Sequence, residues 1–161
     1  MHIDNIITEL NKDWFDRFTF SSVSTSINGL EFTQNYYVNY EKRPDPESKF
    51  IVHGTDTYML AINHLCAFFI HLIRINHADI FTPIQNRPFY ELSKRILIAK
   101  SELEFLKPVF TQDIEVKSKI ESFKDRYEKH KMVFLDASVD INQGLHKFNM
   151  NGVINMRDEL F

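Results

Sequence analysis

Cysteine, glycine and proline are scarce in this sequence, whose 161 residues include one cysteine, four glycines and five prolines. The single cysteine, Cys66, excludes an internal disulfide, and its apolar neighbours indicate a small core residue. So few glycines leave no glycine-rich phosphate loop, and the Gly-x-Ser-x-Gly elbow of many hydrolases does not occur. A formal charge of −3 argues against nucleic acid as the main partner, because phosphate binding needs a concentrated positive surface.

The first residues also lack the continuous apolar core of a signal peptide, since charged and apolar side chains alternate along residues 1–14. Together with the lone cysteine, this pattern predicts a cytoplasmic protein. Aromatic residues are abundant instead, with 15 phenylalanines and six tyrosines. They predict a bulky core or an apolar cavity lined by rings, within a chain of single-domain length.

The longest apolar run, from Tyr58 to Ile75, is broken only by four polar residues: Asn63, His64, His71 and Arg74. Its length would permit a membrane span, but polar side chains at these places would be costly in hydrocarbon. We therefore expect no membrane insertion and predict a core helix over residues 55–77.

The rest of the chain predicts further elements of one domain over residues 1–161. Apolar residues at helical spacing predict a helix over 1–17, and Asn28-Gly29 between two β-rich runs predicts a hairpin over 18–41 with a type I′ turn. Alternating residues over 89–156 predict four successive antiparallel strands in a meander. A curved antiparallel sheet around one apolar helix is the hotdog arrangement, an α+β fold.

The start of the predicted central helix gathers the candidate site residues. Thr55 is a plausible N-cap, Asp56 complements the positive end of the helix dipole, and Gly54 permits close approach of the backbone. His53 then lies beside amide hydrogens that could hold an oxyanion. It could act as a general acid or base, or be a partly exposed loop histidine.

Asn63 lies about two turns into that helix, where a sheet-wrapped helix is buried. A buried amide needs a hydrogen-bond partner, which could be a backbone group, a water molecule or the carbonyl of a bound ligand. His64, the next residue, either packs in the core or contributes to the site. No histidine spacing makes a convincing metal site, and no cofactor is expected.

Two segments resemble a known family. The segment "ELSKRILIAKSELEFLKPV" (residues 91–109) resembles a strand of hotdog acyl-thioester enzymes, and "HG…YMLAINHLCAFF" resembles their central helix. Both segments resemble the FcoT-like family, described as long-chain acyl-CoA thioesterases and as (2E)-enoyl-acyl-carrier-protein glycyltransferases. The resemblance implies catalytic roles for His53 and Asn63.

The resemblance also implies an acyl-CoA or acyl-carrier-protein substrate and a homodimer or higher oligomer, with the acyl chain between helix and sheet. A family tyrosine could be supplied by Tyr36, Tyr37 or Tyr40. The predicted substrate-binding residues are Gly54, Thr55, Asp56, Tyr37, Tyr40 and His64.

Three functions stay open at this point. The first is an enzyme acting on fatty-acyl thioesters, by hydrolysis or by addition of glycine to a 2-enoyl thioester. The second is a 3-hydroxyacyl dehydratase in which His53 removes the α-proton. The third is a non-catalytic hotdog subunit that pairs with an active partner.

Overall fold

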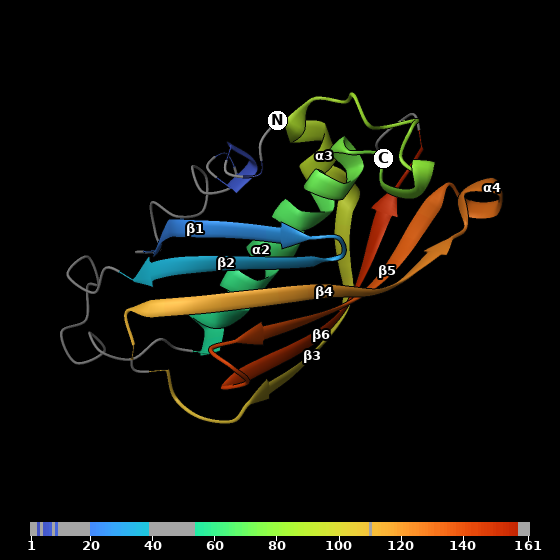
Figure 1. Ribbon diagram of the computed structural model, residues 1–161. Helices are drawn as coiled ribbons and strands as arrows, with labels where there is room; N and C mark the ends of the chain where they lie inside the picture. Colours follow the sequence, from blue (N-terminus) through green and yellow to red (C-terminus); the bar gives the residue numbers. More distant parts are fainter. Residues whose placement is uncertain are drawn as a thin grey trace.

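The computed structural model describes residues 3, 5–7, 9, 20–38, 54–109 and 111–157. Its central element is α2 (Gly54–Arg74), a helix of 21 residues that lies across one face of a curved sheet (Figure 1). The strands are β1 (Phe20–Asn28), β2 (Glu31–Val38), β3 (Ile96–Phe105), β4 (Asp113–Asp125), β5 (Met132–Ile141) and β6 (His146–Asn155). Three short helical segments are η3 (His77–Asp79), α3 (Phe89–Arg95) and α4 (Tyr127–His130).

The six strands form one sheet in the order β1-β2-β4-β5-β6-β3, and every neighbouring pair is antiparallel. Strand β5 shows why the sheet covers α2: alternate residues from Val133 to Ile141 are buried, while the intervening ones are half-exposed. A strand with this period of two buries one face and leaves the other to solvent. The predicted α+β hotdog architecture is confirmed.

The predicted four-strand meander is wrong in one respect. Strands β4, β5 and β6 do follow one another, but β3 pairs with β6 and not with β4. The edge of β4 that a meander would give to β3 is occupied by β2, with Phe32 opposite Ser118. As a result, β3 is an edge strand on the opposite side of the sheet from the hairpin.

Residues 89–95 also differ from the expectation of strand. They form α3, which begins directly after Pro88. Proline is favoured at the start of a helix, and charged side chains four residues apart then lie on one face. Arg87, Glu91 and Arg95 have this spacing, and Leu92 turns into the core.

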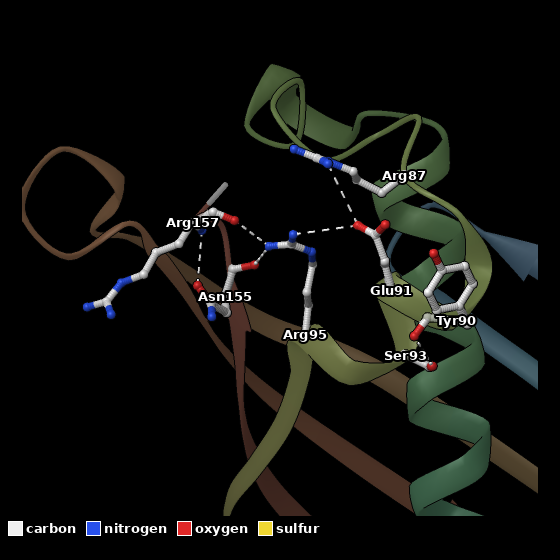
Figure 2. Close-up of polar contacts among 7 residues, drawn as sticks. All are labelled: Arg87, Tyr90, Glu91, Ser93, Arg95, Asn155 and Arg157. Atoms are coloured by element: carbon white, nitrogen blue, oxygen red, sulfur yellow. Dashed lines mark hydrogen bonds and ion pairs between the residues drawn. The ribbon is translucent and has the colours of Figure 1, made fainter. Parts of the chain in front are cut away.

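Arg95 is the most deeply buried cation of the described residues, with 1% of its surface exposed. Its Nη1 donates to the backbone carbonyls of Asn155, at 3.2 Å, and Arg157, at 2.5 Å, and its Nη2 lies 3.8 Å from the Glu91 carboxylate (Figure 2). These contacts fasten the end of β6 to the junction between α3 and β3. We call this cluster the Arg95 clamp.

The hairpin between β1 and β2 forms with a different turn from the predicted type I′. Asn28 pairs with Glu31, so the two loop residues are Gly29 and Leu30. Only Gly29 has a positive φ, of 60°, which is the pattern of a type II′ turn with glycine at its first central position. The predicted turn after Ile141 is present, with positive φ at three successive residues, Asn142, Gln143 and Gly144.

The helix α2 is long and apolar enough to cross a membrane by length and composition, but 67% of its most apolar window is buried inside the protein. This agrees with the predicted core helix. It ends at Arg74, earlier than predicted, because Asn76 adopts a left-handed φ of 51° that terminates the helix. At the N-terminus, Ile3, Ile6 and Ile7 are helical and buried in the same core; most of the helix predicted over 1–17 lies outside the described residues.

Candidate functional site

A pocket of about 500 Å³ opens at the first turn of α2. Among the described residues, its walls are Gly54, Thr55 and Tyr58 from the helix and Leu103 and Phe105 from β3. The lining is mostly apolar, and both β3 side chains are more than one-third exposed. The pocket therefore joins an apolar surface to the first turn of a long helix, where the helix dipole favours negative charge.

Gly54 allows the helix to begin against β3. A Cβ atom at this position would lie 3.0 Å from Cε1 of Phe105 and 3.1 Å from its Cζ, closer than side chains normally approach. The absence of a side chain thus lets the Phe105 ring rest on the backbone of the first helical turn. This close approach forms one corner of the pocket.

Behind the pocket lies a buried pair that the sequence analysis missed. Thr57 is fully buried, and its Oγ1 is 2.8 Å from Nδ1 of His146 at the start of β6. The other ring nitrogen, Nε2, is 2.9 Å from the carbonyl oxygen of Lys107. Because a carbonyl only accepts, Nε2 carries the proton of the neutral ring. The single proton of the Thr57 hydroxyl is then shared between Nδ1 and the Gly54 carbonyl, which lies 3.0 Å from Oγ1.

Burial lowers the pKa of His146 below its usual range, and the hydrogen bond to the Lys107 carbonyl opposes this only in part. The neutral ring is therefore the resting form at neutral pH. Since 3% of His146 is exposed, its ring is not a surface group that a substrate would touch directly. It ties the first turn of α2 to β6 and supports the pocket from behind, packing edge-on against Phe105 at 4.9 Å between ring centroids.

A sequence signal for His146 existed. Phe148, Met150 and Ile154 predicted an inward-facing parity for the last strand, and His146 stands two residues before Phe148. Extending that parity backwards would have placed the histidine on the face that contacts α2.

Of the residues predicted to bind substrate, Gly54 and Thr55 line the pocket. Thr55 lies inside the first turn of the helix, which begins at Gly54, so its predicted role as N-cap is wrong. Asp56 is half-exposed in the same turn. His53 and Tyr40 lie outside the described residues, and their roles stay predictions.

His64 is placed in the core, and its assignment as a substrate-binding residue stays a prediction. It is fully buried, its ring stacks on Phe32 with 4.1 Å between centroids, and its Nε2 donates to the Phe32 carbonyl at 3.2 Å. Burial lowers the pKa of His64 to about 3, against which the bond to the Phe32 carbonyl acts only weakly. The ring is neutral and packed between α2 and β2.

Asn63 is buried, with 8% of its surface exposed, but it is not among the described residues that line the pocket. The pocket reaches Tyr58, and Asn63 lies five residues further along, about 7.5 Å along the helix axis. The structure therefore does not bring Asn63 together with Gly54 and Thr55. Its catalytic role remains a prediction from the resemblance.

The tyrosines of β2 divide between the two faces of the sheet. Tyr36 is 2% exposed and faces α2, with its ring 6.4 Å from that of His64, and burial raises the pKa of its phenol. Tyr37 is 39% exposed and, by the alternation of β2, points to the opposite face. Tyr37 is thus turned away from the helix, and its predicted substrate-binding role stays a prediction.

Within the described part of the chain, no group of three or more histidine, cysteine, aspartate or glutamate side chains could hold a metal ion.

No protein-family model and no curated protein matches the sequence. The structure is similar to a thioesterase from Haemophilus influenzae, with a TM-score of 0.60 and 9% identity over 100% of this chain and 96% of that one. The structure is also similar to a putative thioesterase from Ralstonia eutropha, described as phenylacetic acid degradation-related. The TM-score is 0.59 and the sequence identity is 7%, over 96% of this chain and 100% of that one.

A hypothetical thioesterase from Streptococcus pneumoniae, solved with coenzyme A, gives a TM-score of 0.52 and 10% identity, covering 95% and 99% of the two chains. At such identities the likeness carries the fold and nothing finer. The chain has the hotdog fold.

Proposed function

We propose that this protein hydrolyses acyl thioesters, with coenzyme A or acyl carrier protein as the thiol. One observation carries the proposal: a mostly apolar pocket of about 500 Å³ opens directly at the N-terminus of the 21-residue helix α2. An acyl group needs an apolar wall, and a reacting carbonyl needs donors for the charge that develops on its oxygen. The proteins of similar fold that are called thioesterases, one of them solved with coenzyme A, support the choice of thioester chemistry.

In this proposal the acyl group lies against Tyr58, Leu103 and Phe105, and its carbonyl oxygen points to the amides of the first helical turn. A water molecule attacks the carbonyl carbon, negative charge moves onto the oxygen, and the carbon–sulfur bond then breaks. The thiolate leaves and takes up a proton. The backbone N–H groups and the dipole at the start of α2 stabilise the tetrahedral intermediate.

His53, the residue before Gly54, is the proposed general base for the attacking water. Its unperturbed pKa lies near neutrality, which suits a group that accepts and returns a proton. Asn63 is proposed to orient the water or the carbonyl, as the family resemblance implies.

A panel of acyl-CoA thioesters tests the proposal by release of free thiol. Both His53→Ala and Asn63→Ala should lower kcat/KM about 100-fold or more if these residues are catalytic. Tyr90→Ala is the control, because this side chain is 60% exposed on α3 and is not part of the pocket lining. Unchanged rates in both site variants would reject their assignments.

The same panel separates the alternatives. Addition of glycine to a 2-enoyl thioester would consume the enoyl absorbance without releasing thiol, because the nucleophile attacks the β-carbon. Hydration of that substrate would indicate a dehydratase. Absence of any turnover would contradict the enzymatic proposal and favour a non-catalytic subunit.

We also propose a homodimer formed along the outer edge of β3. Among the described strands, β3 pairs with β6 alone, and Leu97, Leu103 and Phe105 on it are between 40% and 53% exposed. If a second copy pairs antiparallel about Ser101, Lys100 of each copy faces Glu102 of the other. Sedimentation velocity should then detect a dimer that Lys100→Glu weakens and Lys100→Glu/Glu102→Lys restores; a monomer at all concentrations would contradict it.

A further inference from the structure

Three aromatic rings from different elements pack together beside the pocket. Phe148 of β6 is fully buried, and its ring packs against Tyr58 at 6.3 Å and against Phe105 at 5.9 Å between centroids. Tyr58 and Phe105 are themselves walls of the pocket. The walls thus converge on a ring that belongs to the core.

A hydrogen bond spans the same place. The hydroxyl of Tyr58 lies 3.3 Å from Oγ of Ser101, which connects α2 directly to β3. Tyr58 is four residues after Gly54, so this bridge crosses the space between helix and sheet about 6 Å along the helix axis from its start. A chain entering at Gly54 would meet it after one helical turn.

Beyond this bridge the space between helix and sheet is filled. Ala61, Leu65 and Phe69 follow Tyr58 on the same side of α2, and all three are fully buried. Phe69 lies so close to β6 that a Cβ atom on Gly152 would be 2.8 Å from its Cε2. Within the part of the chain that the structure describes, no open channel therefore continues from the pocket along the helix.

We propose that this pocket takes a compact acyl group, either a short chain or a single ring, and not the long fatty-acyl chain that the family resemblance implies. The inference rests on the proposed acyl-thioester function, because it specifies the acyl part of that substrate. The aromatic walls suit a flat or short apolar group, and the closed inner end sets the limit on its length.

The length limit gives a quantitative expectation. Where a chain is buried ever deeper in an apolar tunnel, each added methylene improves kcat/KM about fourfold. Here that gain should hold only for the first few carbons and then stop, since later methylenes pass beyond the apolar walls that Tyr58, Leu103 and Phe105 supply.

The experiment measures kcat/KM by thiol release for acetyl-, butyryl-, hexanoyl-, octanoyl-, lauroyl- and palmitoyl-CoA, with benzoyl- and phenylacetyl-CoA as ring substrates. All are kept below their micelle-forming concentrations. We expect the rise to end by hexanoyl-CoA, or one of the ring substrates to be the best of the series. A value that keeps rising through lauroyl- and palmitoyl-CoA would overturn this inference while leaving thioester hydrolysis intact.

Two variants of one residue test the cause of the limit. Tyr58→Ala removes both the ring and the bridge to Ser101. It should raise the ratio of kcat/KM for octanoyl-CoA to kcat/KM for butyryl-CoA by about fourfold or more. Tyr58→Phe removes only the hydroxyl and should keep the wild-type chain-length profile. An unchanged profile in a folded Tyr58→Ala protein would reject the aromatic stop; if that variant does not fold, the wild-type series alone decides. If no substrate of the series releases thiol, both the proposed function and this inference are contradicted.

Discussion

The first turn of α2 borders an open pocket, whereas its last turn is covered by the chain that follows it. At the last turn, Nη1 of Arg74 donates to the Gln85 carbonyl at 2.8 Å, and Nε2 of Gln85 returns a bond to the Arg74 carbonyl at 3.0 Å. The Arg95 clamp then fixes the neighbouring end of β6 (Figure 2). At the first turn, the polar pair Thr57 and His146 is equally buried but stands behind an apolar opening.

The two ends therefore use buried polar groups for different purposes. At the last turn they satisfy backbone carbonyls and close the structure, so we expect substitutions there to change stability alone. At the first turn they hold the helix start in place beside space that a ligand can enter. Activity should depend on the first turn and be insensitive to the last.

The largest expected effect comes from the Arg95 clamp. Arg95→Ala removes two charged hydrogen bonds, each worth about 1.5–3 kcal/mol, and should lower the free energy of unfolding by about 3 kcal/mol or more. Urea denaturation measures the loss. The kcat/KM of the folded fraction should not change, because the clamp lies at the end of the helix away from the pocket.

Arg87→Ala is the matched control for this prediction. Both arginines approach the Glu91 carboxylate at 3.8 Å, but the Arg87 side chain is 38% exposed and that of Arg95 is 1% exposed. An exposed pair contributes at most about 1 kcal/mol, so the two variants should differ by at least 2 kcal/mol. Equal losses would show that burial is not what makes the clamp strong.

The second prediction concerns His64, which lies in the sealed core between the two ends. Its pKa in the folded state is about 3, below the unfolded value of 6.5, so folding keeps it neutral. Its contribution is fully present above pH 6.5 and is lost as the pH falls towards 3, because only the unfolded chain then binds the proton. At pH 4.5, two pH units below the unfolded pKa, the loss amounts to about 2.7 kcal/mol.

His64→Phe isolates this contribution, since phenylalanine can keep the stack on Phe32 but cannot titrate. The stability of the wild type minus that of the variant should decrease by about 2.7 kcal/mol between pH 7 and pH 4.5 in urea titrations. Parallel pH curves for the two proteins would mean that His64 is protonated or solvated in the folded state, and that the core here is less sealed than the structure indicates.

The sequence was sufficient for the elements and their faces. A long apolar run interrupted by four polar residues predicted α2, and alternation from Ile114 to Ile120 predicted the strand β4. It was not sufficient for the order of the strands. Alternation indicates which face of a strand is buried but not which strand lies beside it. The sequence of β3 therefore did not reveal that it pairs with β6, while β4 pairs with β2 of the hairpin.

The candidate site was predicted only in part, because local sequence signals do not reveal contacts between distant segments. Gly54 and Thr55 were found because helix starts have local signals in glycine, threonine and aspartate. The Thr57–His146 pair joins residues 89 positions apart, and no local rule connects them. The pattern also could not separate neighbours on one strand: Tyr36 and Tyr37 are chemically alike, and only the register of β2 with β4 decides which one faces the helix.

The smallest predicted effect tests whether the Thr57–His146 pair holds the first turn. Thr57→Val keeps the shape of the side chain but removes the hydroxyl that bonds to Nδ1 and to the Gly54 carbonyl, and His146→Leu removes the ring. In a double-mutant cycle measured by urea denaturation, we expect a coupling free energy of about 1 kcal/mol, the usual value of a buried hydrogen bond. The control cycle combines Thr57→Val with His64→Phe, two positions about 10.5 Å apart along the same face of α2, and should be additive within about 0.5 kcal/mol. Coupling of equal size in both cycles would mean that the helix transmits strain along its length, and the distinction between its open and closed ends would then fail.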